Sequence, residues 1–313
     1  MASSSSPTET TSSAAAVARS APKLQTLNYV NVAAYLSNFL VVFGATQAGL
    51  PDNGTLSDKY QTLVTPAPYA FAIWGIIFTA ELIFAISQVF PSYRSNELVA
   101  KGVGYSFALA SFAQCAWTIA FGLEKMVLSL VCMLCILLPL LDILVKTSKT
   151  STKIAKPVDY WMLKFPFQIH AAWIMAATLV NFNVVAVAYE ASSMVQTTVG
   201  WVSLVVLFAV GIYAVVKKEN YHRVWVVPCV GSWASFAIAS ELSNPRDMIA
   251  ATFSGSVIAT TKVASTVVAY MLLLVIAIEL ARKIFFGDKG ENERVNTEGE
   301  TGGETEGGYS SLN

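Results

Sequence analysis

Charged side chains are scarce in this sequence, making up 13% of its 313 residues, against the roughly 25% that is typical of soluble domains. Apolar residues make up 55%, and the mean hydropathy is +0.56. This composition excludes an ordinary soluble domain. The 20 Lys and Arg residues are balanced by 20 Asp and Glu residues. No net positive charge is left to neutralise phosphates, so we expect no nucleic acid partner.

The residue types that build catalytic and metal sites are also few. The chain has two histidines, His170 and His222, and its four cysteines all lie in apolar runs, where thiols behave as small hydrophobic groups. We find no nucleophile triad, Walker loop, dinucleotide fingerprint or His/Cys ligand set. The sequence therefore predicts no metal site and no required cofactor, and it argues against a conventional enzyme.

Long apolar runs dominate the rest of the chain. A helix of about 20 apolar residues crosses the hydrocarbon core of a bilayer, and these runs lack the period-two alternation of a barrel strand. The sequence predicts an all-α polytopic membrane helix bundle with about eight transmembrane helices, surrounded by the lipid bilayer. The eight runs are residues 29–49, 69–90, 102–122, 125–145, 161–188, 196–216, 223–241 and 257–281.

The basic residues give an independent test of this topology. Eight spans place Lys59, Lys125, Arg246 and Lys262 on one side and leave the other 16 of the 20 basic residues on the side of both termini. This asymmetry is typical of the positive-inside rule and indicates cytoplasmic termini, or termini on the stromal or matrix side of an organelle. A seven-span alternative, which merges the runs around residues 122–125, would scramble the asymmetry.

Both ends of the chain have the composition of disordered tails. Residues 1–28 are rich in Ser, Thr and Ala, which fits an organellar transit peptide and a plain tail equally well. Residues 287–313 are rich in Gly and Glu and have few apolar side chains to bury. The membrane in which the protein resides is left open by these features.

Polar and aromatic residues share helix faces inside several runs. Groups that can form hydrogen bonds at membrane depth normally face the interior of a bundle, where they mark a cavity or a helix contact. The aligned residues are Trp74, Phe78 and Glu81 in the second run, Gln114 and Trp117 in the third, and His170, Trp173, Ala177 and Asn181 in the fifth.

Glu81 is the most informative of these residues, because a lone carboxylate near mid-membrane must be protonated or paired. His170 is the expected partner, since both residues fall in the same half of the bilayer. Two interpretations stay open: a proton-coupled or ligand-binding pair, or a neutral Glu81 hydrogen-bonded to a neighbouring helix.

Several of these segments match the motifs of a known family. Residues 68–78 read PYAFAIWGIIF, residues 114–117 read QCAW, and residues 166–181 read PFQIHAAWIMAATLVN. They resemble the second-, third- and fifth-helix motifs of the translocator protein or tryptophan-rich sensory protein (TspO/MBR) family, and residues 53–60 resemble the loop before the second helix in its longer members. Gln114 and Phe78 depart from the Asn and Tyr usual in the family.

The resemblance implies a five-helix core over residues 29–190 and a three-helix extension over residues 191–286. It also implies a pocket for tetrapyrroles, such as haem or a porphyrin, or for sterol-like molecules. By position, the pocket would be lined by Trp74, Gln114, Trp117, Trp173, Ala177 and Asn181. Indole rings would stack on a flat ligand, Ala177 would leave room, and the two amides would orient it.

The sequence therefore predicts a membrane protein that binds a small, hydrophobic, planar ligand within its first five helices and acts as a sensor, carrier or regulator. One alternative is a secondary transporter that uses Glu81 and His170 as a proton relay. Another is a structural scaffold whose polar faces only hold helices together. Besides the bilayer and the ligand, a second copy of the chain is the partner that we expect, as a homodimer.

Overall fold

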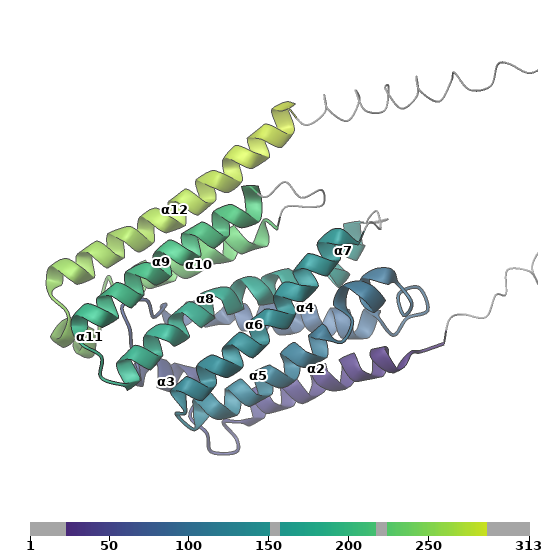
Figure 1. The fold of residues 1–313 in the computed structure, drawn as a ribbon, viewed down its shortest axis with the longest axis horizontal. Helices are drawn as coiled ribbons and strands as arrows, with labels where there is room; N and C mark the ends of the chain where they lie inside the picture. Colours follow the sequence, from purple (N-terminus) through teal and green to yellow (C-terminus); the bar gives the residue numbers. More distant parts are fainter. Residues whose placement is uncertain (1–22, 151–156, 217–223, 287–313) are drawn as a thin grey trace, which may run out of the picture.

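The computed structural model describes residues 23–150, 157–216 and 224–286, and all regular secondary structure in these ranges is helical (Figure 1). The all-α polytopic bundle is therefore confirmed. The predicted disorder of residues 1–22 and 287–313 lies outside the described ranges and stays a prediction.

Each predicted run corresponds to one long helix. These helices are α2 (Thr26–Gly44), α4 (Ile73–Ser87), α5 (Ser106–Gly122), α6 (Met126–Lys149), α8 (Phe165–Ala188), α9 (Ser193–Val216), α10 (Val226–Glu241) and α12 (Gly255–Phe286). The shorter helices are α3 (Asn53–Lys59), η1 (Pro68–Ala72), η2 (Leu98–Val103), α7 (Pro157–Leu163) and α11 (Asp247–Thr252).

Within the described ranges, six helices are long and apolar enough to cross a membrane, with α4 counted together with η1. The other two long helices, α5 and α10, have 17 and 16 residues, which is less than the roughly 20 that we expected for each span. In α5 the shortening has a visible cause. Gly104 adopts a positive φ of 53°, and this left-handed residue, which glycine tolerates, separates η2 from α5.

The turn between α5 and α6 confirms that two helices, and not one, fill residues 106–149. Glu124 has a φ of 58°, and the Lys125 N–H donates to the Ala120 carbonyl oxygen over 2.8 Å. A side chain on Gly122 would lie 3.1 Å from Leu50, so this turn packs closely against the chain that follows α2. The seven-helix alternative is wrong for this region.

The first helix begins at Thr26, two residues before the predicted end of the N-terminal tail. The cause is a capping box: the Gln25 N–H donates to Asn28 Oδ1 over 2.9 Å, while the Gln25 side chain caps the first turn in return. Such reciprocal bonds satisfy backbone donors that have no partner inside the helix.

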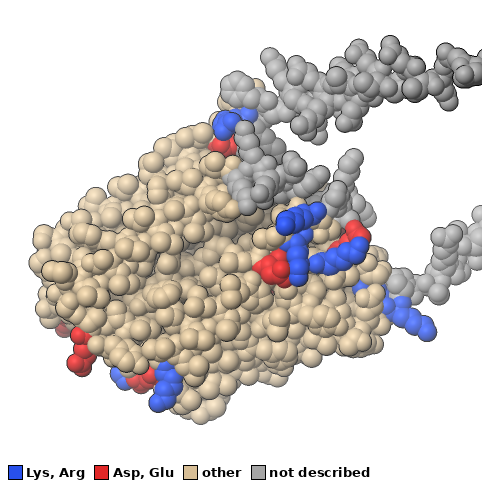
Figure 2. Space-filling view, in the orientation of Figure 1, with Lys and Arg blue, Asp and Glu red and all other residues tan. Residues whose placement is uncertain are grey.

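Both described ends of the chain lie at the same end of the bundle, which we call the terminal end (Figure 1). The linker helices α3 and α11 lie at the opposite end. Figure 2 shows charged side chains gathered at these two ends, with an uncharged band between them. This arrangement is that of an integral, multi-pass membrane protein.

Helices α9, α10 and α12 pack closely through small residues. A side chain on Gly211 of α9 would come within 2.4 Å of Leu272 in α12, and one on Gly231 of α10 within 3.0 Å of the same leucine. Leu272 is fully buried. Small residues let membrane helices approach one another closely in this way, and here they bring α9 and α10 close to α12.

Candidate functional site

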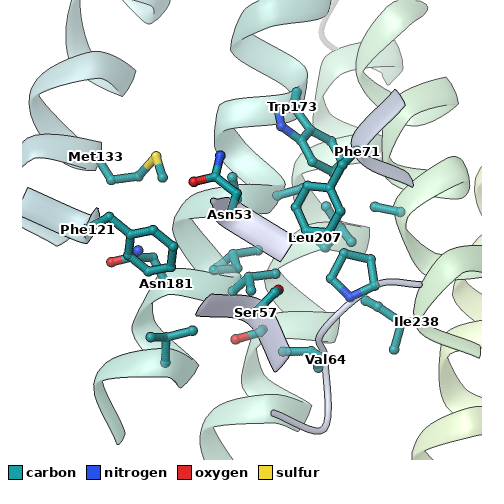
Figure 3. A pocket seen from close by; sticks show the side chains of 18 of the residues that line it. Asn53, Ser57, Val64, Phe71, Phe121, Met133, Trp173, Asn181, Leu207 and Ile238 are labelled. Atoms are coloured by element: carbon teal, nitrogen blue, oxygen red, sulfur yellow. The ribbon is translucent and has the colours of Figure 1, made fainter. Parts of the chain in front are cut away.

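A cavity lies among α4, α5, α6, α8, α9 and α10, close to the end of the bundle that carries α3 (Figure 3). Its cavity volume is about 70 Å³, which is smaller than the roughly 300–1,000 Å³ usual for small-molecule sites. A ligand of that size would enter only if lining side chains moved. The described lining residues include no Asp, Glu, Lys, Arg or His.

Aromatic rings form one wall of the cavity. Trp74 of α4 and Trp173 of α8 meet edge to face, with ring centroids 6.3 Å apart, and Phe71 meets Trp173 in the same way at 6.0 Å. Trp117 of α5 stacks on Phe121 at 5.2 Å. Helices α4, α5 and α8 thus present large apolar surfaces to a single space.

The structure brings five of the nine residues that the sequence singled out to this cavity. These are Trp74, Trp117, Trp173, Ala177 and Asn181. Asn181 is also held in place, because Ser129 Oγ lies 3.2 Å from its Oδ1. Ala177 leaves space beside the tryptophan rings, as expected from its size.

Phe78 and Gln114 do not line the cavity, because they face α2 on the other side of the bundle. Phe78 packs edge to face on Phe43 at 5.2 Å. Gln114 Oε1 accepts a hydrogen bond from Asn38 Nδ2 over 3.1 Å, and both side chains are buried. Phe78 and Gln114 therefore serve contacts between helices. These contacts explain the positions of both side chains without a ligand.

Glu81 and His170 form the pair that the sequence predicts. Glu81 Oε1 lies 2.6 Å from His170 Nδ1, and the two side chains are 0% and 1% exposed. The pair does not line the cavity, but the His170 ring lies 5.8 Å from the ring of Trp74, which does. In the described part of the chain, no group of three or more His, Cys, Asp and Glu residues is placed to hold a metal ion.

Helix α3 forms part of the wall of the cavity, and the sequence did not indicate this role. Asn53 and Ser57 of α3 contribute to the lining (Figure 3). Asp52 begins the helix by accepting a hydrogen bond from the Thr55 N–H over 2.8 Å. This bond lowers the pKa of the Asp52 carboxyl. The buried Leu56 anchors α3 in the core. The sequence signal that was available for this helix is Asp52 before a short polar segment, because Asp is a preferred N-cap residue.

One polar cluster ties α3 to the turn between α5 and α6. Lys59 Nζ lies 2.5 Å from Glu124 Oε2, and the Tyr60 hydroxyl donates to the same oxygen. Both hydrogen bonds lower the pKa of the Glu124 carboxyl, and the bond from Lys59 has the larger effect.

A second polar cluster ties α3 to the segment between α10 and α11. Arg246 lies 2.7 Å from Asp58 and 3.1 Å from Glu241, and Gln61 donates to Glu241 over 2.7 Å. These acceptors, Asp58 first, raise the pKa of Arg246. Helix α3 is thus fixed on two sides.

Helices α9 and α10 complete the cavity, so the first five predicted helices do not enclose it alone. Ser203, Leu204 and Leu207 of α9 line it, together with Ala234 and Ile238 of α10. The residues assigned to a separate extension therefore share the site. The cause is the close packing of both helices on α8.

Hydrogen bonds between distant segments fix this packing. Asn183 of α8 donates to Ser203 Oγ over 2.9 Å. The Ala67 N–H donates to the Ala237 carbonyl oxygen over 3.0 Å, and Trp233 Nε1 donates to the Ala70 carbonyl oxygen over 3.3 Å. The segment before α4 is therefore attached directly to α10.

Comparison with known proteins agrees with this architecture. The family model described as TSPO-like protein matches residues 25–282, which includes every long helix up to most of α12. Comparison with curated proteins and with solved structures returned no significant match. The match covers far more than half of the chain, so this protein is a member of the TSPO-like family.

Proposed function

We propose that this protein binds a small, flat, hydrophobic ligand of tetrapyrrole or sterol-like size in the cavity and acts as a sensor, carrier or regulator and not as a metabolic enzyme. The observation that supports this best is the cavity itself: three tryptophan rings surround an uncharged space. Aromatic walls with a few polar groups are typical of sites for apolar molecules.

A scaffold would not need such a space. Helices that serve only to hold one another pack small residues closely, as α9 and α12 do around Gly211. The cavity instead has bulky rings from α4, α5 and α8 beside the small side chains of Ala176 and Ala177. Large rings beside small side chains leave a gap that closely packed surfaces lack.

Filling the cavity tests the proposal. We expect purified protein to show saturable quenching of tryptophan fluorescence on titration with haem, protoporphyrin or a sterol, and we expect Ala177→Phe to weaken the affinity at least tenfold by occupying the space. Ala116→Phe is the matched control, because Ala116 lies on the exposed face of α5. Absence of saturable binding to any of these ligands by folded protein would refute the proposal.

Helix α3 would control access to the bound ligand. We expect Arg246→Ala to release α3 from α10 and to speed ligand dissociation several-fold in stopped-flow measurements. The thermal stability should change little, because the exposed pair with Asp58 contributes only about 0–1 kcal/mol and Glu241 keeps its hydrogen bond from Gln61. Lys101→Ala is the control, since it removes an exposed pair with Glu97 that lies away from α3. Equal dissociation rates in the two variants would contradict this role.

We also propose that the terminal end faces the cytoplasm, or the stromal or matrix side of an organelle. The distribution of basic residues supports this orientation. A C-terminal tag that proteases reach from outside sealed cells would exclude it. The homodimer stays a prediction.

A further inference from the structure

Helices α5 and α6 form a hairpin whose two ends carry polar and charged groups. At the terminal end, Ser106 Oγ donates to Asp142 Oδ2 over 2.6 Å, and Lys146 Nζ lies 2.6 Å from the same oxygen. At the opposite end, the turn between the two helices carries Glu124 and Lys125. The hairpin therefore crosses the uncharged band of Figure 2 from one charged edge to the other.

The uncharged part of this hairpin is short. Residues 126–141 of α6 carry no charged side chain, and these 16 residues lie between Lys125 and Asp142. At a helical rise of about 1.5 Å per residue, the two charged residues are about 26 Å apart along the helix axis. Val127 and Leu138 within this stretch are exposed, so lipid surrounds this side of α6.

Three other helices give similar lengths. Helix α5 has 17 residues and α10 has 16, which correspond to about 26 Å and about 24 Å. In α12, at the edge of the bundle (Figure 1), the 16 residues 263–278 are uncharged and lie between Lys262 and Glu279. The same spacing thus recurs in a helix outside the hairpin.

The longer helices do not set the thickness of the band. Helices α8 and α9 have 24 residues each, but a long helix fits a thin bilayer by tilting. Lys146 can extend its long side chain toward water, whereas the carboxylate of Asp142 is close to the backbone. Asp142 therefore limits the depth of α6 in the hydrocarbon more strictly than Lys146 does.

We propose that this protein is matched to a thin bilayer, with a hydrocarbon core of about 24–27 Å, and not to the bilayers of roughly 32–33 Å that are rich in sterol and sphingolipid. In a thick bilayer, Asp142 or the turn at Glu124 would enter the hydrocarbon, or the bilayer would thin around the protein. Both outcomes cost free energy. This match does not depend on the cavity or on a ligand.

Vesicles of defined acyl chain length test the match on the full-length protein. We expect the midpoint of thermal unfolding, followed by circular dichroism, to be highest in dipalmitoleoyl- or dioleoyl-phosphatidylcholine. It should be at least about 5 °C lower in dierucoyl-phosphatidylcholine, whose longer chains form a thicker bilayer with the same headgroup.

Removing the charges that limit α6 tests the cause. The double replacement Asp142→Leu and Lys146→Leu extends the uncharged stretch to residue 148. It should reduce the difference in midpoint between dioleoyl and dierucoyl vesicles by roughly half. A general loss of stability lowers both midpoints and cancels in this difference. Glu97→Leu with Lys101→Leu is the matched control, because it removes an exposed pair in η2, outside the long helices.

Two results would overturn the proposal. An equal or higher midpoint in dierucoyl vesicles would contradict the match to a thin bilayer. If the α6 variant and its control changed the lipid difference equally, Asp142 and Lys146 would not mark the edge of the band. Neither measurement involves ligand binding, so these failures are distinct from a failure of the proposed function.

Discussion

Replacement of His170 by Leu is expected to lower the free energy of unfolding by about 3–5 kcal/mol, because it leaves Glu81 buried without its partner. The two side chains are almost completely inaccessible and 2.6 Å apart. They join α4 to α8 directly behind Trp74. Unfolding in mixed micelles, followed by circular dichroism, measures the loss.

Two further variants distinguish the loss of the contact between Glu81 and His170 from a packing defect caused by the substitution. Glu81→Gln keeps a hydrogen-bonding group opposite His170 and should cost about 1 kcal/mol. The double replacement of both residues by Leu should recover much of the stability, since a buried polar pair can be exchanged for apolar groups at little cost. If His170→Leu were as stable as the unchanged protein, the contact would not be stabilising.

Glu81→Gln also tests the transporter alternative. An amide cannot exchange a proton in the way that a carboxyl group does. If Glu81 and His170 formed a proton relay, this variant would lose transport while remaining folded. Full ligand binding and transport in Glu81→Gln would leave the pair with a structural role only. Glu81 does not line the cavity. This position favours a structural role for the pair.

Replacement of Leu207 by Trp is expected to weaken ligand binding at least tenfold, although Leu207 lies outside the five-helix core that the family resemblance implies. Leu207 lines the cavity from α9 and is largely buried. A bulkier ring at this position would occupy space that the ligand needs. The titrations described above measure the effect.

Val205→Trp is the matched control for this substitution. Val205 lies two residues away on the same helix and is 66% exposed, so the new ring points away from the cavity. Its affinity should equal that of the unchanged protein. Normal ligand binding by Leu207→Trp would show that α9 does not contribute to the site.

Hydropathy predicts the helices well because the bilayer imposes a minimum length and an apolar surface on every span. It does not predict which apolar face is buried. In α9, Leu207 lines the cavity and Val205 is exposed, yet both are aliphatic. Because lipid and protein interior select the same residues, the participation of α9 and α10 could not be derived from their composition.

Aligned polar and aromatic residues predict only part of the site. A stripe identifies the inward face of a helix, and Trp74, Trp117 and Trp173 do reach the cavity. Gln114 shares a stripe with Trp117 but bonds to Asn38. The inward face of one helix meets several neighbours, and periodicity does not say which of them each residue contacts.

The position of the cavity in the chain has a consequence for biogenesis. Its lining runs from Asn53 to Ile238, and Arg246 fastens α3, which forms part of its wall. Synthesis proceeds from the N-terminus, so a ribosome must have made most of the membrane-embedded chain before the last wall can dock. A nascent protein that stalls after α8 would already present its tryptophans but would have no enclosed site to hold a ligand.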